Sequence, residues 1–217
     1  GYDAQTLKKK IGESILPNRL SVTFDPTVSK YKNTILSGDY RFDDEGIRGQ
    51  RVEVIKDGVL KNFLMSRIPI EGFSKSNGHG RGNLNIGTET RQSNMLIESS
   101  SPISNEALNS LFVEELKKRG LTFGYRIDKV SGGLTMTGAA SANAFYLNPL
   151  VVYRIYTDGR PEELVRGINI VGTPLAAFSQ IIAESDDQKI FNGMCGALSG
   201  SVPVSAIAPS MLVKELE

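Results

Sequence analysis

Two Asp-Gly pairs, each between stretches that read as β-strands, constrain the fold of this chain most strongly. Residues 51–56 alternate polar and apolar residues, Asp57-Gly58 follows, and residues 59–65 read as the returning strand. An Asp-Gly pair favours the two-residue turn that joins antiparallel strands, so this segment predicts a β-hairpin. Asp158-Gly159 predicts a second hairpin for the same reason.

Two segments carry the signals of helices. Ser104 is a good N-cap, the apolar residues that follow it recur on one helical face, and Gly120 marks the end. Thr173-Pro174 opens a second helix, whose apolar stripe extends to Ile182. Hairpins with intervening helices predict an α+β fold, with predominantly antiparallel sheets and about two substantial helices packed on them. No linker divides residues 1–217, so a single domain is expected.

Weaker patterns add further expectations. Residues 6–15 have the spacing of a short basic helix, and residues 202–207 and 211–216 read as two strands. The carboxylates of residues 43–45 are typical of a solvated loop. Residues 74–85 are rich in Gly, Asn and Ser, and they predict an exposed loop large enough to serve a function.

Composition limits the possible partners. The 217 residues are 40% hydrophobic and 23% charged with a net charge of +1, which is ordinary for a soluble protein and gives no basic footprint for nucleic acid. No apolar run is long enough to span a membrane, and the polar start is unlike a secretory signal. A single cysteine fits a reducing compartment, so a cytoplasmic location is expected.

Cys195 is the residue most open to a chemical role. It lies between Met194 and Gly196 in a glycine-rich stretch, and glycines let the backbone turn sharply or approach another group. A lone cysteine is commonly a small buried apolar residue, whereas a thiol on such a turn can also be a metal ligand or a nucleophile. His79, the single histidine, lies in another glycine-rich stretch, which is either a flexible loop or a site for an anionic or peptide group.

The chain lacks the partners that most catalytic sites need. There is no Gly-x-Ser-x-Gly elbow, Walker A loop or His-Glu-x-x-His pair, and a Cys195–His79 dyad is left open by the sequence. A catalytic zinc ion takes three protein ligands and a water, but this chain offers one cysteine and one histidine. If Cys195 binds a metal, the other ligands come from outside these residues.

Several short motifs, in order along the chain, resemble those of one family. They are Asp43-Asp44-Glu45-Gly46, Asp57-Gly58-Val59-Leu60-Lys61, Asn77-Gly78-His79-Gly80-Arg81, Arg91-Gln92-Ser93-Asn94, Val165-Arg166-Gly167, Gly193-Met194-Cys195-Gly196 and Ser201-Val202-Pro203-Val204. Each motif alone is weak, but the ordered set is specific. The chain resembles the C-terminal half of the TldD/PmbA proteins, which are zinc metallopeptidases also called modulators of DNA gyrase.

The resemblance implies a two-part protein. Its N-terminal half would end in a helix with a His-Glu-x-x-x-His motif just before Tyr2, and Cys195 would be the third zinc ligand. This chain would then hold no catalytic residue of its own. The resemblance also suggests that Asp44, His79, Arg81 and Asn94 line the cleft, where unfolded peptides would bind partly by strand addition.

Two departures from the family pattern qualify this picture. Arg48 stands where many relatives have Pro, and the histidine motif is missing. One thiolate does not make a zinc site, so the chain alone is expected to be inactive and without tightly bound zinc. Expected partners are its own N-terminal half and a family member in a homo- or heterodimer. Alternative roles are a non-catalytic PmbA-like partner subunit and a regulator that binds DNA gyrase.

Overall fold

The computed structural model describes residues 7–83, 85–136 and 144–216. The chain forms two compact units, each built from segments that are distant in sequence. The unit that we call the Cys195 unit comprises Ile11–Ser101 and Gln188–Pro209, and the α1 unit comprises Gly1–Lys10, Pro102–Asp187 and Ser210–Glu217. Mostly antiparallel sheets with two helices confirm the predicted α+β class.

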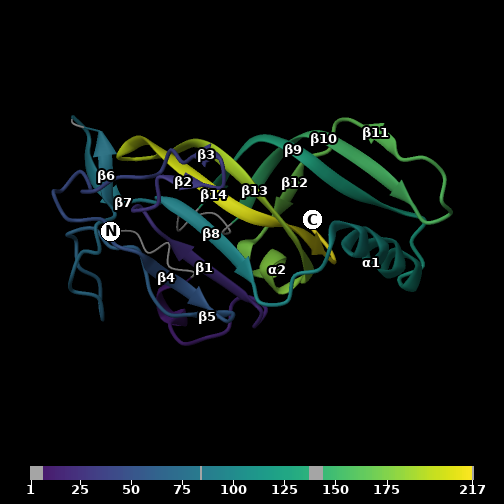
Figure 1. Cartoon of the computed structure of the whole chain (residues 1–217), viewed down its shortest axis with the longest axis horizontal. Helices are drawn as coiled ribbons and strands as arrows, with labels where there is room; N and C mark the ends of the chain where they lie inside the picture. Colours follow the sequence, from purple (N-terminus) through teal and green to yellow (C-terminus); the bar gives the residue numbers. More distant parts are fainter. Residues whose placement is uncertain (1–6, 84, 137–143, 217) are drawn as a thin grey trace. The chain divides into compact units, whose positions relative to one another are not determined.

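Most strand residues of the Cys195 unit belong to one six-stranded sheet, whose order is β13-β14-β8-β1-β4-β5 (Figure 1). Its strands are β1 (Leu20–Phe24), β4 (Val52–Lys56), β5 (Val59–Leu60), β8 (Asn94–Ser99), β13 (Ile181–Ala197) and β14 (Gly200–Val213). β1 lies near the middle and pairs antiparallel with β4 and β8, and four of its five residues are buried. β14 pairs with β8 in parallel, whereas β1 and its two neighbours are antiparallel.

The predicted hairpin at Asp57-Gly58 is confirmed. Both residues have positive φ, 48° and 78°, as a type I′ turn requires. The second strand is shorter than predicted and ends at Leu60 instead of residue 65. The amides of Lys61 and Asn62 both point at the carbonyl oxygen of Val54, so the regular ladder stops there.

The loop predicted over residues 74–85 is present at residues 74–79, but residues 80–83 form a strand. β6 (Gly80–Asn83) pairs with β7 (Gly87–Thr90), and both His79 and Arg81 are buried. The carboxylates at 43–45 were also expected to be solvated, but Asp43 is buried against this hairpin. A further small hairpin joins β2 (Lys30–Tyr31) to β3 (Thr34–Ile35).

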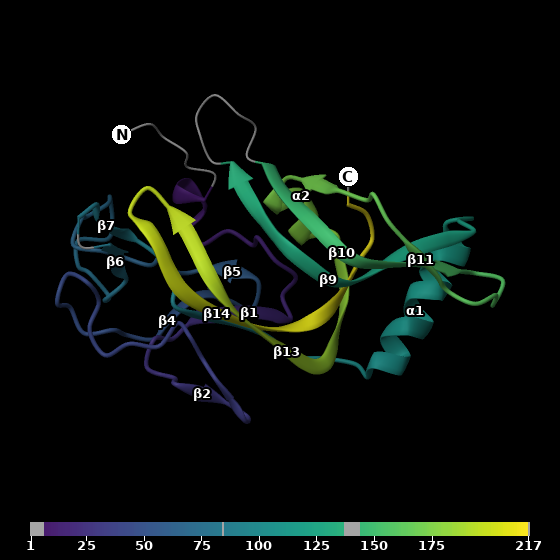
Figure 2. The ribbon, with the colours of Figure 1, turned by 90° about the horizontal axis from the view of Figure 1, so that it is seen from above.

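The α1 unit contains the predicted first helix, α1 (Asn105–Lys118). The Ser104 hydroxyl accepts the amide of Ala107, and Gly120 ends the helix with φ of 68°. α1 packs on β9 (Phe123–Met136) of the long hairpin (Figure 2). Gly124 on this strand leaves room for the side chains of Phe112 and Leu116. The strands of this sheet are β9 (Phe123–Met136), β10 (Ala144–Tyr156), β11 (Glu163–Val165) and β12 (Ile170–Gly172).

Three other predicted elements differ in the structure. In place of the helix predicted over residues 6–15, of which residue 6 lies outside the described residues, there is a 3-10 turn at Lys8–Lys10, because Gly12 turns the chain with φ of 85°. The second helix, α2 (Pro174–Ser179), stops early, and Ile181 and Ile182 instead begin β13, where Ala183 packs with Leu108 and Leu212. β14 is continuous where two strands were predicted.

Neither helix in the described part of the chain has the length and apolar character that a membrane crossing requires.

Candidate functional site

Cys195 lies in the last part of β13, close to the turn that leads into β14. The glycine-rich stretch is therefore a strand that ends in a tight turn, with Gly200 at φ of 90°. The cysteine is half-buried and unpaired, while Met194 and Leu198 beside it are 61% and 86% exposed. The end of this hairpin thus exposes apolar side chains on either side of Cys195 in the sequence.

Arg91 fixes the backbone around Cys195. Its guanidinium donates to the carbonyl oxygen of Cys195, to Ser199 Oγ at 2.8 Å and to the carbonyl oxygen of Gly200 at 2.8 Å. Arg91 is 5% exposed, so these acceptors replace its hydration. A buried arginine that spans both strands holds the turn in one geometry.

Arg81, on β6, makes a second connection to β14. Its Nη1 donates to the carbonyl oxygens of Gln92 (2.6 Å) and Pro203 (2.8 Å), and its guanidinium stacks on the Tyr40 ring at 4.7 Å. Burial lowers the pKa of Arg81, and the negative charges of Tyr40, Asp44 and Cys195 in their ionised forms act against this. The Arg81 carbonyl oxygen also accepts the Ser199 hydroxyl at 3.0 Å, so Arg81 contacts the same turn that Arg91 holds.

The three carboxylates at positions 43–45 hold the β6–β7 hairpin by its backbone. Asp43 Oδ2 accepts the amide of Gly80 at 2.9 Å, and Asp44 Oδ2 accepts that of Gly82 at 2.8 Å. Glu45 accepts the Thr88 hydroxyl at 2.8 Å. Asp43 Oδ1 also accepts two amides within its own turn. These acidic residues act as acceptors for a neighbouring strand pair, and they do not converge on one point.

His79 is fully buried and both of its ring nitrogens are occupied. Nδ1 lies 3.0 Å from Asn77 Oδ1 and 3.2 Å from the Asn77 carbonyl oxygen, so it carries the proton. Nε2 then accepts from Ser93 Oγ at 3.1 Å. Burial lowers the pKa of His79 to about 4. A neutral imidazole with both nitrogens bonded has no free lone pair for a metal or for a proton from Cys195.

Asn94 is also fully buried, at the start of β8. Its Nδ2 donates to the carbonyl oxygens of Asp25 (3.1 Å) and Val28 (2.7 Å), which fixes the loop after β1. Its Oδ1 has no hydrogen-bond partner among the described residues. Of the four predicted cleft residues, Asp44 alone is exposed, and the assignment of all four to a peptide cleft stays a prediction.

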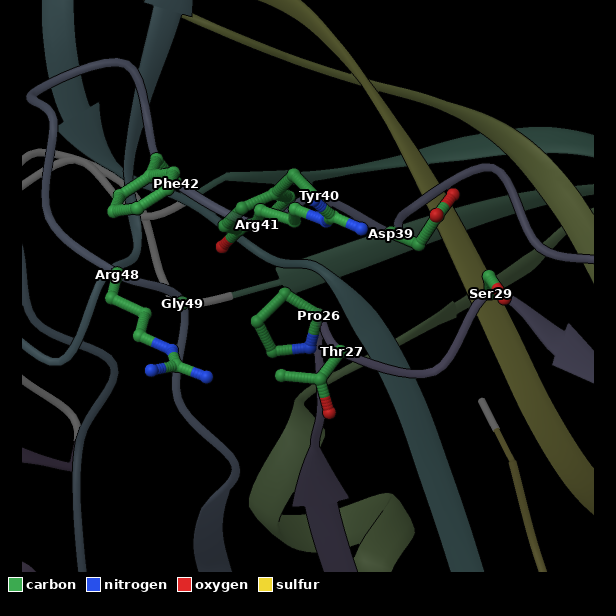
Figure 3. A pocket seen from close by; sticks show the side chains of 9 residues that line it. All are labelled: Pro26, Thr27, Ser29, Asp39, Tyr40, Arg41, Phe42, Arg48 and Gly49. Atoms are coloured by element: carbon green, nitrogen blue, oxygen red, sulfur yellow. The ribbon is translucent and has the colours of Figure 1, made fainter.

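A pocket of about 650 Å³ opens elsewhere on the Cys195 unit (Figure 3). Tyr40 lines it and also stacks on Arg81, so the pocket wall and the Arg81 contacts share one side chain. The Tyr40 hydroxyl donates to the carbonyl oxygen of Gly78 at 2.8 Å, and burial raises its pKa. The lining residues are Pro26, Thr27, Ser29, Asp39, Tyr40, Arg41, Phe42, Arg48 and Gly49.

The described residues do not form a complete metal site. No three His, Cys, Asp or Glu side chains among them come together as a metal would require. Cys195 can offer one ligand, while His79 is occupied. Arg91 and Tyr40 were not singled out from the sequence. For Arg91 a signal was present, because it begins one of the ordered motifs.

This chain is similar in sequence and in fold to known metallopeptidase-family proteins. Residues 3–217 match the family model described as PmbA/TldA metallopeptidase C-terminal domain. The chain belongs to this family, which confirms the resemblance drawn from the motifs. The solved structure of TldE from Thermococcus kodakarensis has the same fold, with a TM-score of 0.64 and 18% identity over 96% of this chain and 41% of that chain.

Curated relatives carry metalloprotease names. A metalloprotease of Archaeoglobus fulgidus is 27% identical over 97% of this chain and 45% of its own length. A zinc metalloprotease TldD homolog of Saccharolobus solfataricus is 26% identical over 81% of this chain and 37% of its own length. The structure of a proposed modulator of a DNA gyrase from Thermotoga maritima has a TM-score of 0.59 at 25% identity, covering 97% of this chain and 41% of that chain. This chain thus spans less than half the length of these relatives.

Proposed function

We propose that this chain is the C-terminal part of a cytoplasmic zinc metallopeptidase that cleaves unstructured peptides, and that Cys195 is one of its zinc ligands. The observation that carries the proposal is the half-buried Cys195 thiol at a rigid hairpin end, in a chain that belongs to a metallopeptidase family. A thiolate is a preferred zinc ligand. The remaining ligands and the general base would come from the N-terminal half of the protein.

The surroundings of Cys195 suit a shared site. Exposed Met194, Leu198 and Phe191 lie on the same hairpin, and burying them against the N-terminal half would remove apolar surface from water. Arg91 would keep the Cys195 backbone in place while the other ligands approach. Because no three potential metal ligands come together among the described residues, no catalytic step is assigned to this chain.

The test uses the full-length protein with Cys195→Ser and Cys195→Ala, and Met194→Ala as a control at the adjacent position. Zinc per subunit is measured by elemental analysis, and cleavage is measured on unstructured peptides. Both cysteine variants should lose most of the zinc and the activity, while Met194→Ala retains the zinc. Undiminished zinc and cleavage in the cysteine variants would refute the proposal.

The same preparation separates the alternative roles. A full-length protein that lacks zinc and cleaves peptides only after a second family member is added would be a non-catalytic partner subunit. Stoichiometric recovery of DNA gyrase in a pull-down would instead favour a regulator. Size measurement of the full-length protein, alone and with a family member, tests the proposed homo- or heterodimer.

A further inference from the structure

Two arginines bring positive charge to the pocket beside Tyr40. Arg48 and Phe42 face each other in a short antiparallel bridge, and Arg41 precedes Phe42 in the same turn. In Figure 3 the Arg48 side chain extends toward Pro26 and Thr27, which form another part of the wall. Asp43 accepts the amide of Ile47 at 2.8 Å and so fixes this turn. The turn places the Arg48 guanidinium at a pocket lined by Tyr40 and Phe42.

These arginines differ from Arg81 and Arg91 in having no protein acceptor. Both Arg41 and Arg48 are exposed, and neither guanidinium has a hydrogen bond or ion pair within residues 7–83, 85–136 and 144–216. A guanidinium presents five donors in a planar fork that matches a carboxylate or phosphate. Two such groups without internal partners, at a pocket of about 650 Å³, are suited to an anionic ligand.

The remaining lining residues favour a carboxylate over a phosphate. Asp39 also lines the pocket, so the two arginines and this carboxylate give the wall a net charge of +1. That charge balances one carboxylate but not a phosphate group, which carries about −1.5 to −2 at neutral pH. Phe42, Tyr40 and Pro26 supply apolar surface for the stem of an acidic side chain.

We propose that this pocket is a binding subsite for a carboxylate of an extended peptide, with Arg41 and Arg48 as the anion-binding residues. The carboxylate comes from an acidic side chain or from a peptide C-terminus. That the ligand is a peptide rests on the proposed function, whereas the anion preference rests on the pocket alone. Tyr40 connects this subsite to Arg81 and through it to the surroundings of Cys195.

The experiment measures binding of short peptides to this chain by NMR titration or calorimetry, without zinc or cleavage. The peptides are acetyl-Ala-Ala-Glu-Ala-Ala-amide and its Gln and Lys analogues, and the Gln peptide with a free C-terminus. The Glu peptide should bind at least tenfold tighter than the Gln amide. The Gln peptide with a free C-terminus should bind more tightly than the Gln amide if the subsite takes terminal carboxylates. If the subsite takes only acidic side chains, these two Gln peptides should bind equally.

Two sets of variants locate the preference. Arg41→Gln/Arg48→Gln should reduce the Glu to Gln ratio to about one, and Arg41→Glu/Arg48→Glu should favour the Lys peptide. Arg51→Gln/Arg67→Gln, two exposed arginines outside the pocket, should keep the wild-type ratio. The proposal would be overturned if the wild type bound all peptides equally, or if binding did not saturate at millimolar concentration. Tighter binding of a phosphoserine analogue would also overturn it, as would a preference for the Glu peptide that survives Arg41→Gln/Arg48→Gln. Failure of the Cys195 variants would leave these ratios unaffected, so the two proposals fail separately.

Discussion

The guanidinium of Arg91 donates to the carbonyl oxygen of Cys195, a residue 104 positions later in the chain. The same guanidinium bonds Ser199 and Gly200 across the turn, so one buried side chain holds both strands of the hairpin end. An arginine used in this way positions the cysteine through its backbone and leaves the thiol itself unbonded by Arg91.

Replacing Arg91 should therefore loosen the hairpin end. In Arg91→Met the apolar stem is kept, but the three acceptors lose their donors, and we expect a loss of about 3 kcal/mol in unfolding free energy. Amide hydrogen exchange of residues 193–200 should rise more than that of β1. Arg67→Met, at an exposed arginine, is the control and should change stability by less than about 0.5 kcal/mol. Unchanged exchange at the hairpin end would contradict the assigned role.

Asp43 should be the most important of the three adjacent carboxylates for stability. It is buried and accepts three amides, so Asp43→Asn places an amide donor against at least one N–H. We expect a loss of about 2 kcal/mol in denaturant unfolding. Asp39→Asn makes the same chemical change at an exposed residue and should cost little. Equal effects in the two variants would show that Asp43 does not hold the β6–β7 hairpin.

Alanine substitutions at Gly46 and Gly58 distinguish the energetic cost of backbone strain from the cost of a steric clash. Gly46 and Gly58 have nearly equal φ, 77° and 78°, but a Cβ at Gly46 meets nothing within 4 Å, whereas at Gly58 it would meet the backbone of Leu16 and Pro17. Gly46→Ala should cost about 1 kcal/mol from the left-handed conformation alone. Gly58→Ala should cost at least 2 kcal/mol more, because backbone has to move. Similar unfolding free energies for both variants would rule out the steric term.

Stability should fall in mild acid because of His79. Its pKa is about 4 in the folded chain and about 6.5 when unfolded, so between these values the unfolded chain binds a proton that the folded chain does not. The unfolding free energy therefore decreases as pH falls from about 6.5 to about 4, by ~1.4 kcal/mol per unit and ~3 kcal/mol in all. Unfolding of the wild type and of His79→Gln, compared at several pH values, isolates this slope. A slope that persists in His79→Gln would assign it to carboxylates.

The elements that sequence predicted correctly are those specified by local chemistry. The Asp57-Gly58 turn needs two residues that tolerate positive φ, and Ser104 with Gly120 bounds α1 by its own capping groups. These signals act over a few residues, and no distant contact overrides them.

The elements that sequence missed depend on distant partners. Residues 80–83 have the composition of a loop, and they become a strand because the carboxylates of Asp43 and Asp44 bind their amides. Ile181 continues a helical pattern, yet it begins β13, whose neighbours in the α1 unit core are Leu108 and Leu212. His79 was singled out for its possible chemistry, but its bonds to Asn77 and Ser93 depend on a fold that no local pattern reveals.

Zinc affinity of the isolated chain provides a final prediction. Cys195 is the one thiol, His79 is bonded through both nitrogens, and no group of three ligands exists among the described residues. A single thiolate lacks the chelation that gives complete zinc sites roughly 10 to 16 kcal/mol of binding free energy. After dialysis the chain should retain well under one zinc per molecule, and Cys195→Ser should retain the same amount. Stoichiometric zinc that disappears in Cys195→Ser would mean that ligands from within this chain complete the site.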